Sequence, residues 1–256
     1  FIFLILMAIK IKDIRSQIIH YESIDSTNLE AHRYIEKNSV SNPTWLIAEQ
    51  QTSGRGRMGS SWVSTKGNLF ATLIYPIEWD LKILPMLSCL VALAIHETIS
   101  FYINSTNKIK IKWPNDILVN NAKISGVLIE NVLSGKKKYS IIGIGINVVS
   151  SPQLADYETS YINQYLNDKT DVSKVFLNLK NNLEDKLNNY SEVNIDDIRL
   201  EMLSKSWKFN EKIEFISSSL SGSGIFEGIS DNYEILIRTD TDQIKLNSGE
   251  LKLIRK

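Results

Sequence analysis

The segment over residues 139–149 constrains the fold more than any other part of the chain, because it is strand-like and nearly all apolar. Such a strand is expected to lie in the centre of a sheet. Short apolar or alternating runs bounded by turn residues predict further strands. These runs cover residues 18–24, 45–48, 68–75, 109–113, 117–119 and 124–132. We therefore expect an α+β protein built on one large sheet.

Helical patterns lie between and after these strands. Apolar positions at helical spacing predict a long core helix over residues 84–102. A shorter helix is expected to begin after a cap at Asp25 or Ser26. Two more helices are predicted over about 172–190 and 196–206.

Beyond residue 212 the chain changes to short strands separated by Ser, Gly, Asp or Asn turns. These strands are expected over residues 213–217, 222–230, 233–238, 243–246 and 250–254. They predict a small barrel or sandwich that follows the helices. We expect a large first domain over residues 1–208 and a small β domain over residues 209–256.

The charge balance limits the classes of partner. The chain carries 29 basic and 29 acidic residues, so its formal net charge is zero. This excludes a global attraction for nucleic acid or anionic lipid, and any anion must therefore bind locally. One cysteine, Cys89, excludes an internal disulfide, fits a reducing compartment and is expected in the core.

The apolar run over residues 1–6 is too short to span a membrane, and Lys10 and Lys12 follow it, unlike the charges of a secretory signal. It is either a translated extension before a start at Met7 or a short buried strand. No targeting signal is evident, and we expect a cytoplasmic protein.

The loop Gly54-Arg55-Gly56-Arg57-Met58-Gly59-Ser60-Ser61-Trp62 is the first candidate site. Its glycines allow close approach of the backbone to a ligand, and its arginines offer forks of N–H donors to a carboxylate or phosphate. A solvated hairpin turn is the alternative. The loop lacks the Gly-Lys-Ser/Thr of a P-loop, and Gly143-Ile144-Gly145 lacks the third glycine of a dinucleotide fingerprint. Those two glycines are instead expected to let a ligand or another strand pass close to the sheet.

A second cluster follows at Lys112-Trp113-Pro114-Asn115-Asp116, at the end of a predicted strand. A simple turn would explain its composition, but Asn and Asp at a strand end also suit a binding site. Lys123 lies across a predicted hairpin turned at Asn120-Asn121 and has apolar neighbours. A single lysine is more often a solvated surface charge. No spacing of Cys and His suggests zinc, and His96 is interpreted as a structural residue of the long helix.

In these elements the chain resembles the biotin protein ligases. The matching elements follow the family order and are Asp25-Ser26-Thr27-Asn28, Ala48-Glu49-Gln50-Gln51 leading into Gly54-Arg55-Gly56-Arg57, Lys112-Trp113-Pro114-Asn115-Asp116, Lys123-Ile124-Ser125-Gly126 and Gly143-Ile144-Gly145-Ile146-Asn147. The resemblance implies a mixed-sheet catalytic domain of the class II synthetase-like, biotin–lipoate ligase type, followed by an SH3-like β-barrel. It also implies that biotin reacts with ATP to give biotinyl-5′-AMP, and that the biotin then passes to a lysine of a carboxylase carrier domain.

The resemblance assigns roles to residues. Biotin would be bound by Ser26, Thr27, Asn28, Gln51, Arg55, Gly56, Arg57 and Lys123. ATP and the adenylate would be bound by Arg55, Arg57, Trp62, Asn115, Lys123 and Asn147. Lys123 and Arg57 would offset negative charge in the reaction, and Asp116 would orient or deprotonate the incoming amine. Mg²⁺ would enter with ATP, without a dedicated protein site.

The chain departs from the family pattern at two places. Ser60 stands where members often carry Arg, so the chain departs from the family inside the glycine–arginine loop itself. Fewer than thirty residues precede Asp25, so the winged helix-turn-helix of the repressor-type members does not fit, and a ligase without DNA-binding activity is predicted.

The expected protein partner is the biotin carboxyl carrier protein of acetyl-CoA carboxylase or a related carboxylase, with no nucleic acid and no membrane. The strands near residues 139–149 could pair with a second copy at a homodimer edge. The nearest alternative function is that of a lipoate or octanoate protein ligase of the same fold. A non-enzymatic regulator or binding module built on the terminal β domain is a rival from another class.

Overall fold

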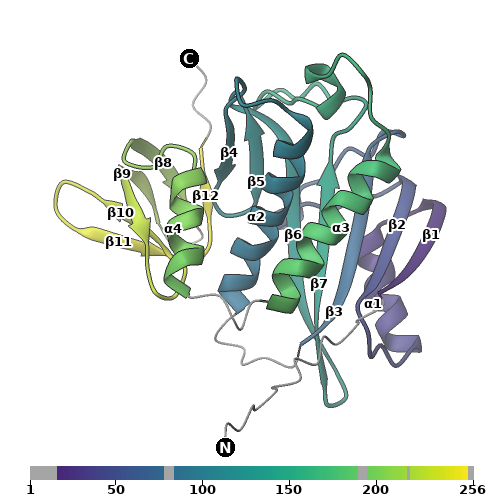
Figure 1. The fold of residues 1–256 in the computed structure, drawn as a ribbon. Helices are drawn as coiled ribbons and strands as arrows, with labels where there is room; N and C mark the ends of the chain where they lie inside the picture. The colour runs from purple at the N-terminus through teal and green to yellow at the C-terminus, as the bar shows by residue number, and fades with distance from the viewer. Residues whose placement is uncertain (1–15, 78–83, 190–194, 218–219, 253–256) are drawn as a thin grey trace, which may run out of the picture.

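The computed structural model describes residues 16–77, 84–189, 195–217 and 220–252. Within these ranges the chain forms a seven-stranded mixed sheet with helices on both faces, and a second sheet of five strands (Figure 1). The α+β class is confirmed. The run over residues 1–6 and Met7, for which two interpretations were open, lies outside the described residues.

The large sheet has the strand order β1-β2-β3-β7-β6-β5-β4. β1 and β2 run parallel, and all other neighbours are antiparallel. The strands are β1 Gln17–Ile24, β2 Thr44–Gln51, β3 Leu69–Pro76, β4 Ile109–Lys112, β5 Asp116–Val119, β6 Ala122–Ser134 and β7 Lys137–Ile146. Each strand predicted from the sequence is present, with its ends moved by a few residues.

β7 occupies the centre of this sheet, as its apolar sequence predicts. It pairs with β3 on one side and with β6 on the other. Because both of its backbone edges are occupied, β7 itself has no free edge for a second copy, and pairing through another strand near it stays a prediction. A homodimer formed in another way stays a prediction.

The helices cover both faces of the sheet (Figure 1). α1 Thr27–Lys37 lies on one face, and α2 Leu84–Tyr102 and α3 Val172–Asn189 lie on the other. α4 Ile195–Lys205 stands beside the smaller sheet. All four agree with the predicted helices, and Ser26 is the N-cap of α1.

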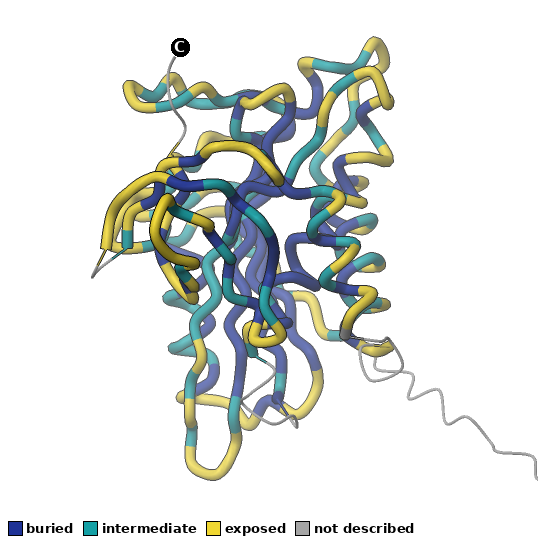
Figure 2. Tube along the Cα trace, turned by 90° about the vertical axis from the view of Figure 1, so that its left-hand side faces the viewer, coloured by how far each residue is buried: buried dark blue, intermediate teal, exposed yellow. Residues whose placement is uncertain are grey.

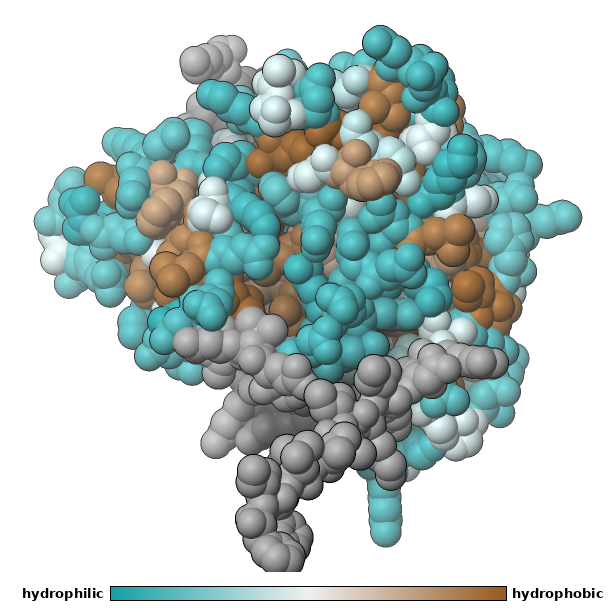
Figure 3. Space-filling view, in the orientation of Figure 1, coloured by the Kyte–Doolittle hydropathy of each residue, from teal (hydrophilic) through white to brown (hydrophobic). Residues whose placement is uncertain are grey.

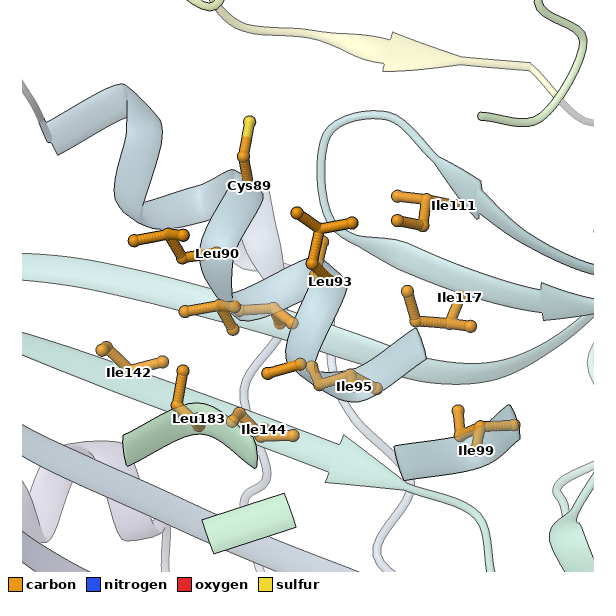
Figure 4. Packing of buried hydrophobic residues seen from close by; sticks show 14 of the residues in the cluster. Cys89, Leu90, Leu93, Ile95, Ile99, Ile111, Ile117, Ile142, Ile144 and Leu183 are labelled. Atoms are coloured by element: carbon orange, nitrogen blue, oxygen red, sulfur yellow. The ribbon is translucent and has the colours of Figure 1, made fainter. Parts of the chain in front are cut away.

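The two covered faces explain why β7 is apolar at almost every position. Ile141 belongs to the smaller core cluster with Ala31 of α1, whereas Ile142 and Ile144 pack against α2 and α3. Figure 4 shows this second layer, with Leu93 of α2 among its members. In Figure 2 the buried residues, coloured dark blue, lie in the middle of the sheet, and the turns at its ends are exposed.

Among the described residues, α2 is long and apolar enough to cross a membrane by length and composition alone. Most of its residues are buried against the sheet and the neighbouring helices, as in the core helix of a globular domain. On the face that carries α2 and α3, hydrophilic residues cover most of the surface between scattered apolar patches (Figure 3). Cys89 is buried in α2, as expected.

The smaller sheet has the order β11-β10-β9-β8-β12 and is antiparallel. Its strands are β8 Lys212–Ile216, β9 Ser221–Ile229, β10 Ile235–Arg238, β11 Gln243–Leu246 and β12 Glu250–Leu251. A small C-terminal β domain is therefore present. β10 begins later than predicted because Tyr233 has a positive φ in the turn that precedes it.

The smaller sheet is connected to the larger one through β4. The Trp207 amide donates to the Ile111 carbonyl over 2.8 Å, and Ser206 forms a bridge with the same residue. These contacts bring the turn at Gly249, just before β12, to the edge of the large sheet that carries Lys112.

Candidate active site

A cavity of about 280 Å³ lies on the α1 face of the large sheet, beside the N-terminus of α1. On this face β7 presents Ile141, Gly143 and Gly145 in alternation, so the last two positions project no side chain. A Cβ added at Gly145 would lie 2.5 Å from the Trp62 ring, and one at Gly143 would collide with Asn28. In the structure, two side chains of the site approach these glycines closely, and the approach of a ligand stays a prediction.

The structure brings most of the predicted site residues to this cavity. Those that line it are Ser26, Thr27, Asn28, Gln51, Arg55, Gly56, Arg57, Trp62, Asn115, Asp116 and Lys123. Asn147 is the exception and lies beneath the site, where it is 2% exposed. Its Nδ2 donates to the Ser160 carbonyl over 3.0 Å, and its Oδ1 has no hydrogen-bond partner among the described residues.

Polar groups at the start of α1 form one end of the cavity. The Gln51 Oε1 accepts from both the backbone amide of Thr27 (2.9 Å) and its hydroxyl (3.1 Å). Asp25, two residues before Thr27, binds the Arg33 guanidinium through both carboxylate oxygens, at 2.7 and 2.9 Å. Arg33 lowers the pKa of Asp25 to about 2. The N-terminus of α1 is thus held by side-chain contacts from both sides.

The glycine–arginine loop is closed by its own hydrogen bonds. Arg55 and Ser61 form an antiparallel bridge, and the Gly56 amide donates to the Ser60 carbonyl over 2.7 Å. The Ser60 hydroxyl donates to the Arg57 carbonyl over 2.7 Å. The residue that departs from the family pattern thus takes part in the turn.

Trp62 covers the floor of the cavity at Gly145. Its Nε1 is buried and has no hydrogen-bond partner among the described residues. The Lys123 Nζ lies 5.5 Å from the centre of its ring. The Trp62 ring offers a flat surface for stacking and an indole N–H for donation. It therefore suits a ligand that both stacks and accepts a hydrogen bond.

Asp116 lies between two lysines, of which Lys112 is buried and Lys123 is partly buried. Its carboxylate is 2.8 Å from the Lys123 Nζ and 3.6 Å from the Lys112 Nζ. Burial alone would lower the pKa of Lys123, but Asp116, Tyr157 and Glu250 outweigh it, so the pKa is raised. Lys123 is therefore a fixed positive charge over the usable pH range.

Arg57 completes the cationic side. Its Nη1 donates to the Asn115 Oδ1 over 3.2 Å and to the Gly249 carbonyl over 3.1 Å. Burial lowers the pKa of this arginine, although its guanidinium stays charged because arginine is the most basic side chain. Desolvated N–H donors of this kind bind an incoming anion more strongly than exposed ones do.

Sequence reasoning assigned no role to several residues that line the cavity, among them Lys112, Tyr157, Gly249 and Glu250. The Lys112 Nζ lies 3.0 Å from the Glu250 Oε1, and both line the cavity together with Gly249. Lys112 stands in a motif that was recognised, so its place next to Asp116 could have signalled a role. No local pattern marks Gly249 or Glu250, which reach the cavity from the C-terminal domain.

The lining charges favour an anion. Arg55, Arg57, Lys112 and Lys123 face only two lining carboxylates, Asp116 and Glu250. An acidic ligand would gain from this excess of positive charge. Among the described residues, no group of three or more His, Cys, Asp or Glu side chains could hold a metal ion.

The fold and the site thus define an α+β domain built to hold a negatively charged ligand. A family model described as the biotin/lipoate A/B protein ligase family matches residues 21–147. The bifunctional ligase/repressor BirA of Bacillus subtilis is 31% identical over 245 residues, which are 92% of this chain and 74% of that protein. The chain belongs to the biotin/lipoate A/B protein ligase family.

Two further relatives are biotin protein ligases by name. The biotin–[acetyl-CoA-carboxylase] ligase of Paracoccus denitrificans is 28% identical over 223 residues, 84% of this chain and 91% of that one. The structure of biotin protein ligase from Aquifex aeolicus in complex with biotin and ATP has a TM-score of 0.77 and 27% identity, and covers 94% of this chain and 99% of that one. The resemblance to biotin protein ligases stated from the motifs is confirmed.

Proposed function

We propose that this protein is an ATP-dependent biotin protein ligase. It joins biotin to ATP as biotinyl-5′-AMP and transfers the biotin to a lysine of a carboxylase carrier domain. The observation that carries the proposal is the single cavity in which the start of α1, the glycine–arginine loop and the Asp116–Lys123 pair meet. Relatives solved or named with biotin, ATP and a carboxylase support the same choice of substrates.

The biotin end is assigned to the start of α1. Ser26, Thr27, Asn28 and Gln51 offer donors and acceptors for the ureido ring, which itself carries both. Arg55 and Gly56 border the same cavity and would meet the biotin carboxylate. A ligand without the ring would leave these buried polar groups unmatched and bind less well.

The first half-reaction is assigned to the cationic side. A carboxylate oxygen of biotin bonds to the α-phosphorus of ATP, and pyrophosphate leaves. Arg57 and Lys123 stabilise the negative charge that builds on the oxygens around that phosphorus. Mg²⁺, bound to the ATP phosphates, supplies further charge neutralisation.

The second half-reaction is assigned to Asp116. The carrier amine attacks the biotinyl carbonyl carbon and loses a proton, while AMP leaves with the electrons of the broken C–O bond. Asp116 orients that amine or accepts its proton, and the side chains of Lys112 and Lys123 lie beside its carboxylate. Both roles need the carboxylate, so Asp116→Ala should block transfer more than adenylate formation.

The adenine end is assigned to Trp62, Asn115 and Asn147. Trp62 offers a stacking surface, and Asn115 already accepts from Arg57. The Asn147 Oδ1, which has no partner in the part of the chain that the structure describes, suits an exocyclic amine. A ligand reaches it only if the segment around Ser160 shifts.

We assign residues 1–208 to the catalytic domain and residues 209–256 to an SH3-like barrel. The five antiparallel strands in the order β11-β10-β9-β8-β12 support that small β fold. The carrier protein is expected to belong to acetyl-CoA carboxylase or a related enzyme. A cytoplasmic location and a homodimer without DNA or membrane partners complete the proposal.

The proposal is tested by mass spectrometry of a biotin carboxyl carrier domain after incubation with the protein, biotin and Mg·ATP. We expect one biotinyl mass increment on the carrier, absent when either small molecule is withheld. A parallel incubation with lipoate tests the alternative ligase. Modification by lipoate and not by biotin would overturn the assignment.

A further inference from the structure

Glu130 lies on β6 behind the cavity, outside the lining residues. Its carboxylate meets side chains from three segments. The Asn28 Nδ2 donates to its Oε2 over 2.9 Å, the Arg55 Nη1 lies 3.3 Å from its Oε1, and the His32 Nε2 lies 3.5 Å from its Oε2. Two of these partners, Asn28 and Arg55, line the cavity.

The contact with Asn28 determines which way that amide points. A carboxylate can only accept, so the NH₂ of Asn28 must face Glu130. Its Oδ1 accepts from the Thr72 hydroxyl over 2.8 Å on the other side. Asn28 is 4% exposed, so neither contact is replaced by bulk water. The orientation of the Asn28 amide is therefore fixed by Glu130 at its nitrogen and by Thr72 at its oxygen.

The contact with Arg55 uses the second carboxylate oxygen. Among the described residues, Glu130 is the acid that pairs with this arginine, whose side chain is 40% exposed. A guanidinium offers five N–H donors, so pairing through one nitrogen leaves others for a ligand. The pair holds a loop side chain at the cavity.

We propose that Glu130 is a positioning residue, which orients Asn28 through one carboxylate oxygen and holds Arg55 through the other. This inference rests on the proposed function. One carboxylate thereby connects the biotin end of the cavity to the loop that covers the adenylate. Glu130 itself stays behind the lining residues and acts through them.

Two substitutions separate the two contacts. Glu130→Ala removes both. Glu130→Gln keeps an oxygen that can accept from Asn28 but removes the charge that pairs with Arg55. Glu36→Gln, at an exposed position of α1 away from the cavity, is the matched control. Urea unfolding of each variant establishes that it is folded.

The readouts are the KM for biotin and kcat in biotin-dependent ATP–pyrophosphate exchange, and the release of biotinyl-5′-AMP into solution. For Glu130→Ala we expect the KM for biotin to rise about tenfold, the effect of losing one charge-assisted hydrogen bond. The kcat should stay within about threefold of the parent value. For Glu130→Gln we expect a KM within about threefold of the parent, and adenylate release about two- to fivefold faster, as for loss of a half-exposed ion pair.

The outcomes distinguish this inference from the proposed function. If the parent protein shows no biotin-dependent exchange, the proposed function fails. If the parent is active and the KM for biotin of Glu130→Ala equals that of Glu36→Gln, Glu130 does not position Asn28. Release by Glu130→Gln at the parent rate would show that Glu130 does not hold Arg55.

Discussion

At the residue scale, the chemistry depends on where charges are buried. Lys123 has 15% of its side chain exposed, lies beside Asp116 and faces the rings of Trp62 and Tyr157 at 5.5 and 5.4 Å. A lysine with these neighbours differs from the solvated surface lysine that sequence statistics favour. Its position near Asp116 agrees with the hairpin predicted from the sequence.

Replacing Lys123 by Ala should slow biotin-dependent ATP–pyrophosphate exchange about a hundredfold or more, because a fixed charge near the reacting oxygens is lost. The fold should persist, since Lys112 still pairs with Asp116. Lys136→Ala, in the exposed β6–β7 turn, is the control. Exchange close to the parent rate in Lys123→Ala would reject the assigned role.

Replacing Arg57 by Ala should let biotinyl-5′-AMP escape about tenfold faster, because this arginine bridges the loop to Asn115 and Gly249. Hydroxylamine trapping of the released adenylate measures the escape. Met58→Ala, at a loop tip that is 83% exposed, controls for a general disturbance of the loop. Equal leakage from Arg57→Ala and the parent would contradict the clamp.

At the scale of elements, α2 shows how a core helix tolerates a polar side chain. His96 lies in this apolar helix with its Nε2 3.4 Å from the Ile109 carbonyl. Burial, with a smaller effect of Lys205, lowers the pKa of His96 to about 4. This agrees with the structural role expected from the sequence.

The pH dependence of stability follows from this histidine. In the unfolded chain its pKa is about 6.5, so unfolding takes up a proton between about pH 6.5 and pH 4, and stability falls as the pH falls through that window. Urea unfolding should show a loss of about 1–2 kcal/mol between pH 7 and pH 5 from this group. His96→Gln should lose less over that interval, whereas the exposed control His20→Gln should follow the parent. Parallel curves for His96→Gln and the parent would contradict the role of His96.

At the scale of the whole molecule, the C-terminal domain completes the cavity. Gly249 has a φ of +135°, and an added Cβ would lie 2.6 Å from the Ile216 carbonyl oxygen. Its own carbonyl accepts from Arg57, and the next residue, Glu250, pairs with Lys112. The turn before β12 thus depends on glycine and carries two contacts to the cationic side of the site.

Gly249→Ala should displace this turn and raise the KM for Mg·ATP about three- to tenfold, through loss of contacts that hold Arg57 and Lys112. The KM for biotin should stay within about twofold, because the biotin end lies at α1. Gly228→Ala is the matched control, since its added Cβ would lie 3.5 Å from Leu236, an ordinary contact. An unchanged KM for Mg·ATP in Gly249→Ala would show that the C-terminal domain does not contribute to ATP binding.

Much of the fold could be predicted from local patterns. The apolar run of β7 indicated a central strand, and the helical spacing of residues 84–102 gave the bounds of α2. The position of Asn147 could not be predicted, because its burial depends on the Ser160 segment packing over it. The pairing of β7 with β3 and β6 could not be predicted either, because the residues of a strand do not determine which strands pair with it.

By itself, the sequence determined the elements and the chemical groups of the site, because periodicity, turn residues and short motifs are properties of neighbouring residues. The tertiary structure alone decided which groups meet. It placed Glu250 on Lys112 across 138 positions of the chain and gave Glu130 its partners Asn28 and Arg55. Contacts of this kind arise only when distant segments pack, and no local pattern contains them.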